Sequence, residues 1–218
     1  MTSAQPPSTD APWTPLTVED LTDLFGDLDA RWWLSGGVAL EHWLGEPIRE
    51  QANIDVSTLP GDVAALIAAL PAHLRAWAVL VDGLVAFADV PAGADLQTIG
   101  VHDPERDAWV LQINVEDGTP DRWLYRRDPR LSIPWDEAVL DVRGVPTGAP
   151  GVQLLWKTLR PRPQDEVDRE TVLPALSDEE RTRLRRDILS IHPHSTWAIH
   201  FRSPFAPAKA SWNRKKKG

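Results

Sequence analysis

A pair of glycines at positions 36 and 37 constrains the fold of this chain more than any other feature. Residues 32–35 read Trp-Trp-Leu-Ser, which is typical of a short buried strand, and residues 38–44 are mostly apolar, as in a packed helix. The chain must therefore turn from a strand into a helix at Gly36 and Gly37. Such a turn exposes backbone N–H groups at a helix N-terminus, and these groups together with the helix dipole favour a bound phosphate.

Two polar side chains on the next expected strand point toward the same place. Residues 53–57 read Asn-Ile-Asp-Val-Ser, an alternation that predicts a half-buried strand. Asn53 and Asp55 are two residues apart, so both lie on one face of that strand. Carboxylates at such positions commonly hold Mg²⁺, which binds oxygen ligands together with substrate phosphates.

The remaining pattern predicts an α+β fold, with a small mixed sheet, packed helices and a helical C-terminal segment. We expect helices over residues 17–30, 62–70, 151–159, 165–176 and 177–189, a hairpin over 77–88, and a strand over 109–115. Residues 134–142 fit a strand and a short helix equally well. The expected organisation is a disordered lead (1–15), an α+β core (16–148), a helical segment (149–200) and a basic flexible tail (201–218).

Charge and composition narrow the classes of partner. The net charge is −9, and the segment from residue 202 onward holds six basic and no acidic residues, leaving 17 basic against 32 acidic residues before it. An acidic body of this kind disfavours nucleic acid as a partner. The absence of cysteine excludes disulfides and thiolate metal sites. No apolar run approaches the roughly 20 residues of a membrane span, so we expect a cytoplasmic protein that does not bind membranes.

Three later motifs follow the glycine turn and the Asn-x-Asp strand in a fixed order. They are Trp-Leu-Tyr-Arg-Arg-Asp-Pro-Arg at 123–130, Pro-Gly-Val-Gln-Leu-Leu-Trp-Lys at 150–157 and Gln-Asp-Glu-Val-Asp at 164–168. The ordered set resembles the polymerase-β-like nucleotidyltransferases, and within them the aminoglycoside 2″-adenylyltransferase-like group, over about residues 30–197. The resemblance implies the nucleotidyltransferase fold and a transfer of AMP from ATP that depends on Mg²⁺.

The departures from the family pattern fall on the metal-binding triad. The first aspartate of the pattern is Asn53 in this chain, the third is Gln112, and only the second, Asp55, remains. Two negative charges are thereby missing from a site that holds two divalent cations, and a glutamine amide cannot accept a proton as the third aspartate does. We therefore expect no metal-dependent nucleotidyl transfer and no metal ligands.

The leading hypothesis is a cleft reused for a small metabolite, either for binding or for acid–base catalysis without metal or cofactor. Asp55 and Glu116 are the candidate proton-transfer residues. The candidate ligand-binding residues are Ser35, Gly36, Gly37, Asn53, Gln112, Lys157, Asp165 and Asp168. The structural alternatives are a simple turn at the glycines, a lysine stem packed on apolar surface, and a solvated helix start at the two aspartates.

Two other functions remain open at this stage. The chain could be an active adenylyltransferase that uses ATP and Mg²⁺ on an aminoglycoside-like alcohol, with Asp55 and a further acid such as Glu116, Asp117 or Glu50. It could also be a non-enzymatic interaction partner, for example a toxin–antitoxin component, in which an exposed apolar patch would matter more than the cleft.

Overall fold

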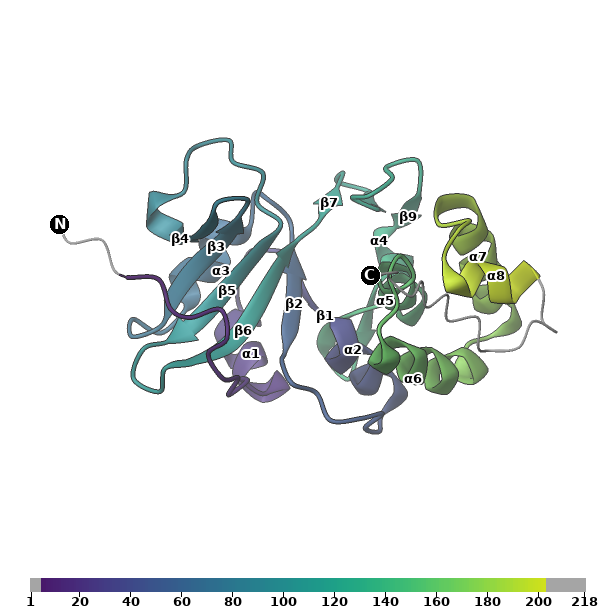
Figure 1. Ribbon diagram of the computed structural model, residues 1–218, viewed down its shortest axis with the longest axis horizontal. Coiled ribbons are helices and arrows are strands. Elements are labelled where there is room, and N and C mark those ends of the chain that lie inside the picture. The colour runs from purple at the N-terminus through teal and green to yellow at the C-terminus, as the bar shows by residue number, and fades with distance from the viewer. Residues whose placement is uncertain (1–4, 203–218) are drawn as a thin grey trace, which may run out of the picture.

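The computed structural model describes residues 5–202 and confirms the α+β class (Figure 1). An eight-stranded mixed sheet runs in the order β10-β11-β1-β2-β6-β5-β3-β4. Its strands are β1 (Trp32–Ser35), β2 (Asp55–Thr58), β3 (Arg75–Leu80), β4 (Gly83–Ala86), β5 (Thr98–Asp103), β6 (Ala108–Val115), β10 (Val139–Val142) and β11 (Val145–Gly148). A three-stranded sheet contains β7 (Asp117–Gly118), β8 (Arg122–Leu124) and β9 (Ser132–Pro134).

The helices pack partly on the large sheet and partly on one another. They are α1 (Val18–Phe25), α2 (Gly36–Leu44), α3 (Val63–Ala69), α4 (Trp135–Ala138), α5 (Pro150–Lys157), α6 (Pro163–Val172), α7 (Asp178–Ile191) and α8 (Thr196–Arg202). Two 3₁₀ turns, Phe87–Asp89 and Leu173–Ala175, complete the order. Within the described range, every helix is too short or too polar to cross a membrane.

Strand register brings the polar residues of three strands into two rows. Strand β1 is antiparallel to β2, with Ser35 opposite Asp55. Strand β2 is parallel to β6, with Asp55 opposite Gln112 and Ser57 opposite Asn114. Residues in register share a face of the sheet. Ser35, Asp55 and Gln112 therefore form one row across it, and Ser57 and Asn114 form a second row.

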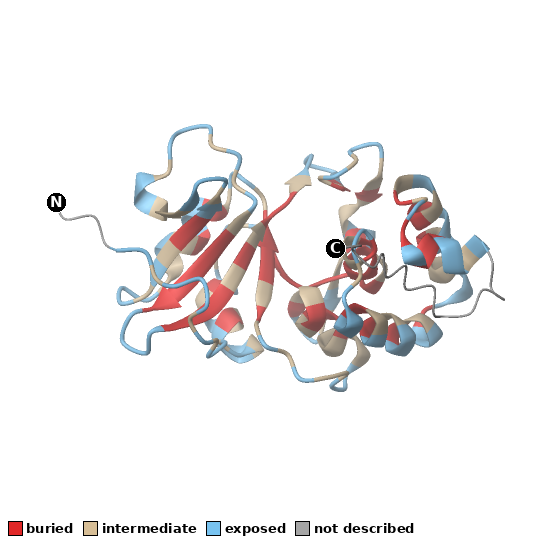
Figure 2. Ribbon diagram, viewed as in Figure 1, coloured by how far each residue is buried: buried red, intermediate tan, exposed pale blue. Residues whose placement is uncertain are grey.

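The buried side chains form two separate clusters (Figure 2). The first lies between the large sheet and helices α1 and α3, and includes Phe25 and Leu66. The second lies among α2, α5, α7 and the small sheet, and includes Trp33, Trp123 and Trp197, each at most 1% exposed. The polar rows on β1, β2 and β6 lie where these two packed regions meet.

Part of the predicted disordered lead (1–15) is ordered, namely the described residues next to β6, whereas residues 1–4 lie outside the described range. Residues 12–16 run beside the part of β6 that β2 does not reach. The amides of Thr14 and Leu16 donate to the carbonyls of Trp109 and Val110, both at 2.9 Å, and the Trp13 and Trp109 rings lie 6.4 Å apart. These hydrogen bonds satisfy the free edge of β6, which explains the ordered placement. Residues 203–218, which make up nearly all of the predicted basic tail, lie outside the described range.

Candidate functional site

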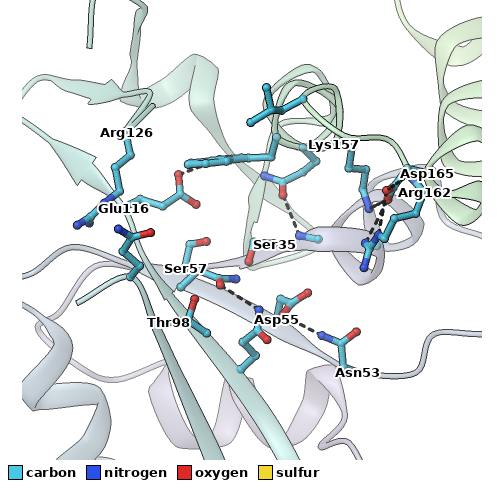
Figure 3. A pocket seen from close by; sticks show the side chains of 18 of the residues that line it. Ser35, Asn53, Asp55, Ser57, Thr98, Glu116, Arg126, Lys157, Arg162 and Asp165 are labelled. Atoms are coloured by element: carbon cyan, nitrogen blue, oxygen red, sulfur yellow. Dashed lines mark hydrogen bonds and ion pairs between the residues drawn. The ribbon is translucent and has the colours of Figure 1, made fainter. Parts of the chain in front are cut away.

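A cleft of about 970 Å³ opens above the polar rows of the sheet (Figure 3). Strands β1, β2 and β6 supply its floor, and α5 with the start of α6 supplies one wall. The predicted site residues that line it are Ser35, Gly36, Gly37, Asn53, Asp55, Gln112, Glu116, Lys157 and Asp165. The cleft therefore gathers all of the predicted residues except Asp168.

Side chains from other parts of the chain pack directly against the glycine turn. Gly36 has a φ of 69° and heads α2, and a Cβ at this residue would collide with the Asp55 carboxylate. A Cβ at Gly37 would collide with the Gln51 side chain. The backbone N–H of Gly36 donates to Gln153 Oε1 at 2.8 Å. The sequence predicts that the Gly36 N–H group faces a phosphate, but in the structure this group is hydrogen-bonded to the Gln153 side chain.

Asp55 lies at the centre of the floor. Its Oδ1 accepts a hydrogen bond from the Asn53 side-chain amide at 3.0 Å. Burial raises the pKa of Asp55 to about 6, and the charges of Lys157 and Arg162 and the Asn53 hydrogen bond oppose that rise. With a pKa of about 6, this carboxyl can exchange a proton near neutral pH.

The donor set around Asp55 does not fit the two divalent cations that the fold's enzymatic chemistry implies. Gln112, opposite Asp55, donates its amide to Asn114 Oδ1 at 3.0 Å, and Asn53 donates to Asp55 itself. The two amides bring no negative charge to the floor, whereas Mg²⁺ sites are usually built on carboxylates together with substrate phosphates. Over residues 5–202, no cluster of three His, Cys, Asp or Glu side chains has a geometry suited to a metal ion.

Lys157, Asp165 and Asp168 form a buried ion-pair network. Lys157 Nζ lies 3.0 Å from Asp165 Oδ1 and 2.9 Å from Asp168 Oδ2. Arg49 Nε reaches Asp168 Oδ1 at 2.8 Å, and Arg162 Nε reaches Asp165 Oδ2 at 3.0 Å. The alternative of a solvated helix start is wrong, because the two aspartate side chains are only 3% and 0% exposed. Asp168 does not reach the cleft and instead positions Arg49 and Lys157.

Glu116 is buried at the far side of the cleft from Lys157 (Figure 3). Its Oε2 accepts hydrogen bonds from the indole N–H groups of Trp123, at 2.5 Å, and Trp156, at 3.3 Å. Burial raises the pKa of Glu116, whereas the nearby Ser57 hydroxyl and the two indoles favour the ionised form. The Ser57 hydroxyl thus acts on Glu116 from close by, although its geometry falls short of a full hydrogen bond.

Sequence reasoning missed several residues that shape the site. Gln153 and Trp156 both lie in the motif at 150–157, but only the lysine of that motif was assigned a role. Ser57 continues the alternation of residues 53–57, of which Asn53 lies just before β2 and not on it as predicted. That alternation was a usable signal, whereas the indole contacts to Glu116 depend on tertiary packing and leave no local trace.

Comparisons with known proteins show the fold. No protein-family profile matches the chain, and no curated protein matches it significantly in sequence. A structure of the antibiotic-resistance factor ANT(2'')-Ia superposes with a TM-score of 0.52 at 14% identity, covering 87% of this chain and 96% of that one. A lincomycin-bound structure of the lincosamide antibiotic adenylyltransferase LnuA gives 0.53 at 17% identity, covering 74% and 99%. The nucleotidyltransferase fold implied by the motifs is thus confirmed.

Proposed function

We propose that this chain binds a small metabolite in its cleft and does not carry out metal-dependent nucleotidyl transfer. The observation that supports this most directly is the pair of amides, Asn53 and Gln112, that lie beside Asp55 on the floor. Two divalent cations would place four positive charges next to a single carboxylate. Lys157 and Arg162, which favour the ionised form of that carboxylate, are balanced by Asp165 and Asp168 on α6, so the floor offers the cations one carboxylate in place of three.

Acid–base catalysis without a metal is the second candidate, and the pKa of Asp55 supports it. A carboxyl with a pKa of about 6 can both accept and return a proton near neutral pH. Glu116 is the other candidate acid, since burial raises its pKa and it lines the same cleft. A bound metabolite would lie between the two carboxyls, as Figure 3 places them on the floor and on the far wall.

The test restores the missing carboxylates. Isothermal titration with ATP, with and without Mg²⁺, compares the native chain, the double variant Asn53→Asp with Gln112→Asp, and a control, Asn114→Asp. The control adds one carboxylate to the same strand face, two residues beyond Gln112. We expect no Mg²⁺-dependent binding in the native chain or the control, and a gain of such binding in the double variant.

Mg²⁺-dependent ATP binding by the native chain, weakened in Asp55→Ala, would overturn the proposal in favour of an active adenylyltransferase. A second measurement tests the positive part of the proposal. Thermal unfolding in EDTA with a set of metabolites should find compounds that stabilise the native chain and not Asp55→Ala. Stabilisation by none of them would favour a role as an interaction partner instead.

A further inference from the structure

A second pocket, here called the α7 pocket, lies against another face of the helix α5 that also borders the cleft. It measures about 270 Å³, just below the range of about 300–1,000 Å³ that is usual for pockets that bind small molecules. Helix α5 carries Gln153 and Lys157 on the side of the cleft. The apolar residues that line the α7 pocket are Ile133, Leu140, Ala149, Val152, Leu155 and Leu184. A pocket of this size and lining suits one large apolar side chain better than a metabolite.

The polar lining of the α7 pocket is acidic. Arg183, which lines it, pairs with Glu137 and Glu179, and Arg186 pairs with Asp187 at 2.9 Å. The carboxylates of the lining are those of Asp136, Glu137, Glu179, Glu180 and Asp187. Five carboxylates against two arginines leave an excess of negative charge, which favours a cationic occupant.

The residues that follow Arg202 carry the complementary features. Residues 203–218 include five basic residues and no acidic one, and four of the five form the run 214–217. Trp212 precedes this run by two residues, whereas Phe205 is nine residues away from it. A single short segment therefore offers a large indole for the apolar lining and cations for the carboxylates.

The described end of the chain lies near the α7 pocket. Helix α8 packs beside α7 (Figure 1), and the Arg185 side chain donates to the Phe201 carbonyl at 3.0 Å. Arg185 follows Leu184, which lines the pocket, so the end of α8 lies about one or two helical turns from it. Ten residues lead from Arg202 to Trp212 and span up to about 33 Å when extended. Trp212 can therefore reach the pocket within one molecule.

We propose that residues 209–217 of this chain occupy the α7 pocket, with the Trp212 indole on the apolar lining and the basic run 214–217 against the carboxylates. The occupied pocket supports α5 from the side opposite the residues that it contributes to the cleft. The inference goes beyond the proposed function and holds whatever the cleft binds.

The first test locates the segment in the full chain. Because the chain has no cysteine, Ser211→Cys provides a single site for a nitroxide label next to Trp212. Paramagnetic broadening of backbone amide signals then reports which residues lie near the label. We expect broadening at Leu140 and Leu184, on two sides of the α7 pocket, and weaker broadening in about 1 M salt, where charges are screened beyond about 3 Å.

A pair of double variants tests the charge complementarity. Asp136→Lys with Glu179→Lys reverses two exposed carboxylates of the pocket and should abolish the broadening. The matched control, Asp82→Lys with Glu105→Lys, changes the net charge equally at exposed turns of the large sheet and should leave it intact.

Thermal unfolding tests the apolar contact. Trp212→Ala should lower the midpoint of the full chain by about 2–4 °C, because it removes the ring from the pocket, whereas Phe205→Ala should change it by less than about 1 °C. In the Asp136→Lys, Glu179→Lys background, Trp212→Ala should cause no further loss, since the two changes disrupt one contact.

Three results would overturn the inference. The first is the absence of broadening at the α7 pocket, and the second is broadening at Asn53 and Gln112 instead, which would place the segment in the cleft. The third comes from mixing unlabelled ¹⁵N chain with labelled ¹⁴N chain. Broadening of similar size in that mixture would assign the pocket to the segment of a second copy. None of these results bears on the binding of ATP or metabolites, so the proposed function is tested separately.

Discussion

The substitution Asp55→Asn should stabilise the protein in a pH-dependent way. The pKa of Asp55 is about 6 in the folded chain against an ordinary value of 3.8, so the folded state binds the proton more tightly than the unfolded state. The stability contributed by this carboxyl is therefore greatest below pH 3.8 and is lost as the pH rises to about 6. A shift of about two pH units corresponds to about 3 kcal/mol, and partial exposure of Asp55 reduces this to about 2–3 kcal/mol.

Urea unfolding followed by tryptophan fluorescence between pH 4 and pH 8 measures this difference. The asparagine stays neutral throughout, so the variant should match the native chain near pH 4 and exceed it by about 2–3 kcal/mol at pH 8. The control is Asp82→Asn, a change at an exposed turn between β3 and β4, which should show no such trend. An equal effect of Asp55→Asn at both pH values would refute burial of the charge as the cause.

Three further changes test other parts of the structure. Asp168→Asn removes the carboxylate that pairs with Arg49 and Lys157, so it should lower the free energy of unfolding in urea by about 3 kcal/mol. The control, Glu170→Gln on the exposed side of α6, should lower it by less than about 0.5 kcal/mol. Glu116→Gln keeps an acceptor for the two indoles and removes a charge that burial disfavours, so it should stabilise the chain more at pH 8 than at pH 4, and the opposite trend would contradict the raised pKa. Trp13→Ala should cost about 1 kcal/mol and speed hydrogen exchange at the amides of Thr14 and Leu16; unchanged exchange would mean that the N-terminal segment is held without the ring.

The residues of the site that could be predicted from the sequence are those whose neighbours along the chain indicate a turn or a strand. A strand, two glycines and a helix must form a tight turn, and polar residues two apart on a strand must share a face. These rules placed Ser35, Gly36 and Gly37 beside Asn53 and Asp55, and the structure brings them together. The order of motifs also placed Gln112 at the third position, and β6 pairs it directly with Asp55.

The elements that sequence reasoning missed have weak local signals. Strand β5 was missed although Ile99 and Val101 alternate with Thr98 and His102, because Gly100 in its middle weakens the strand pattern. The hairpin of β10 and β11 turns at Arg143 and Gly144, both with positive φ, and Arg-Gly is not one of the pairs that usually indicate such a turn. Long-range pairs leave no local trace at all, as with Arg49 and Asp168, which are 119 residues apart.

The amides on the floor of the cleft and the ion-pair network on α6 are two aspects of one charge balance. A site that holds divalent cations needs its acids on the floor, where they would face the metal. Here the floor keeps one acid, Asp55, and its neighbour Asn53 donates a hydrogen bond to it. The acids that balance the cationic wall lie instead on α6, where Asp165 and Asp168 hold Lys157. Returning carboxylates to the floor would compete for that lysine with α6, so restored metal binding should come at the expense of the network that now closes the wall.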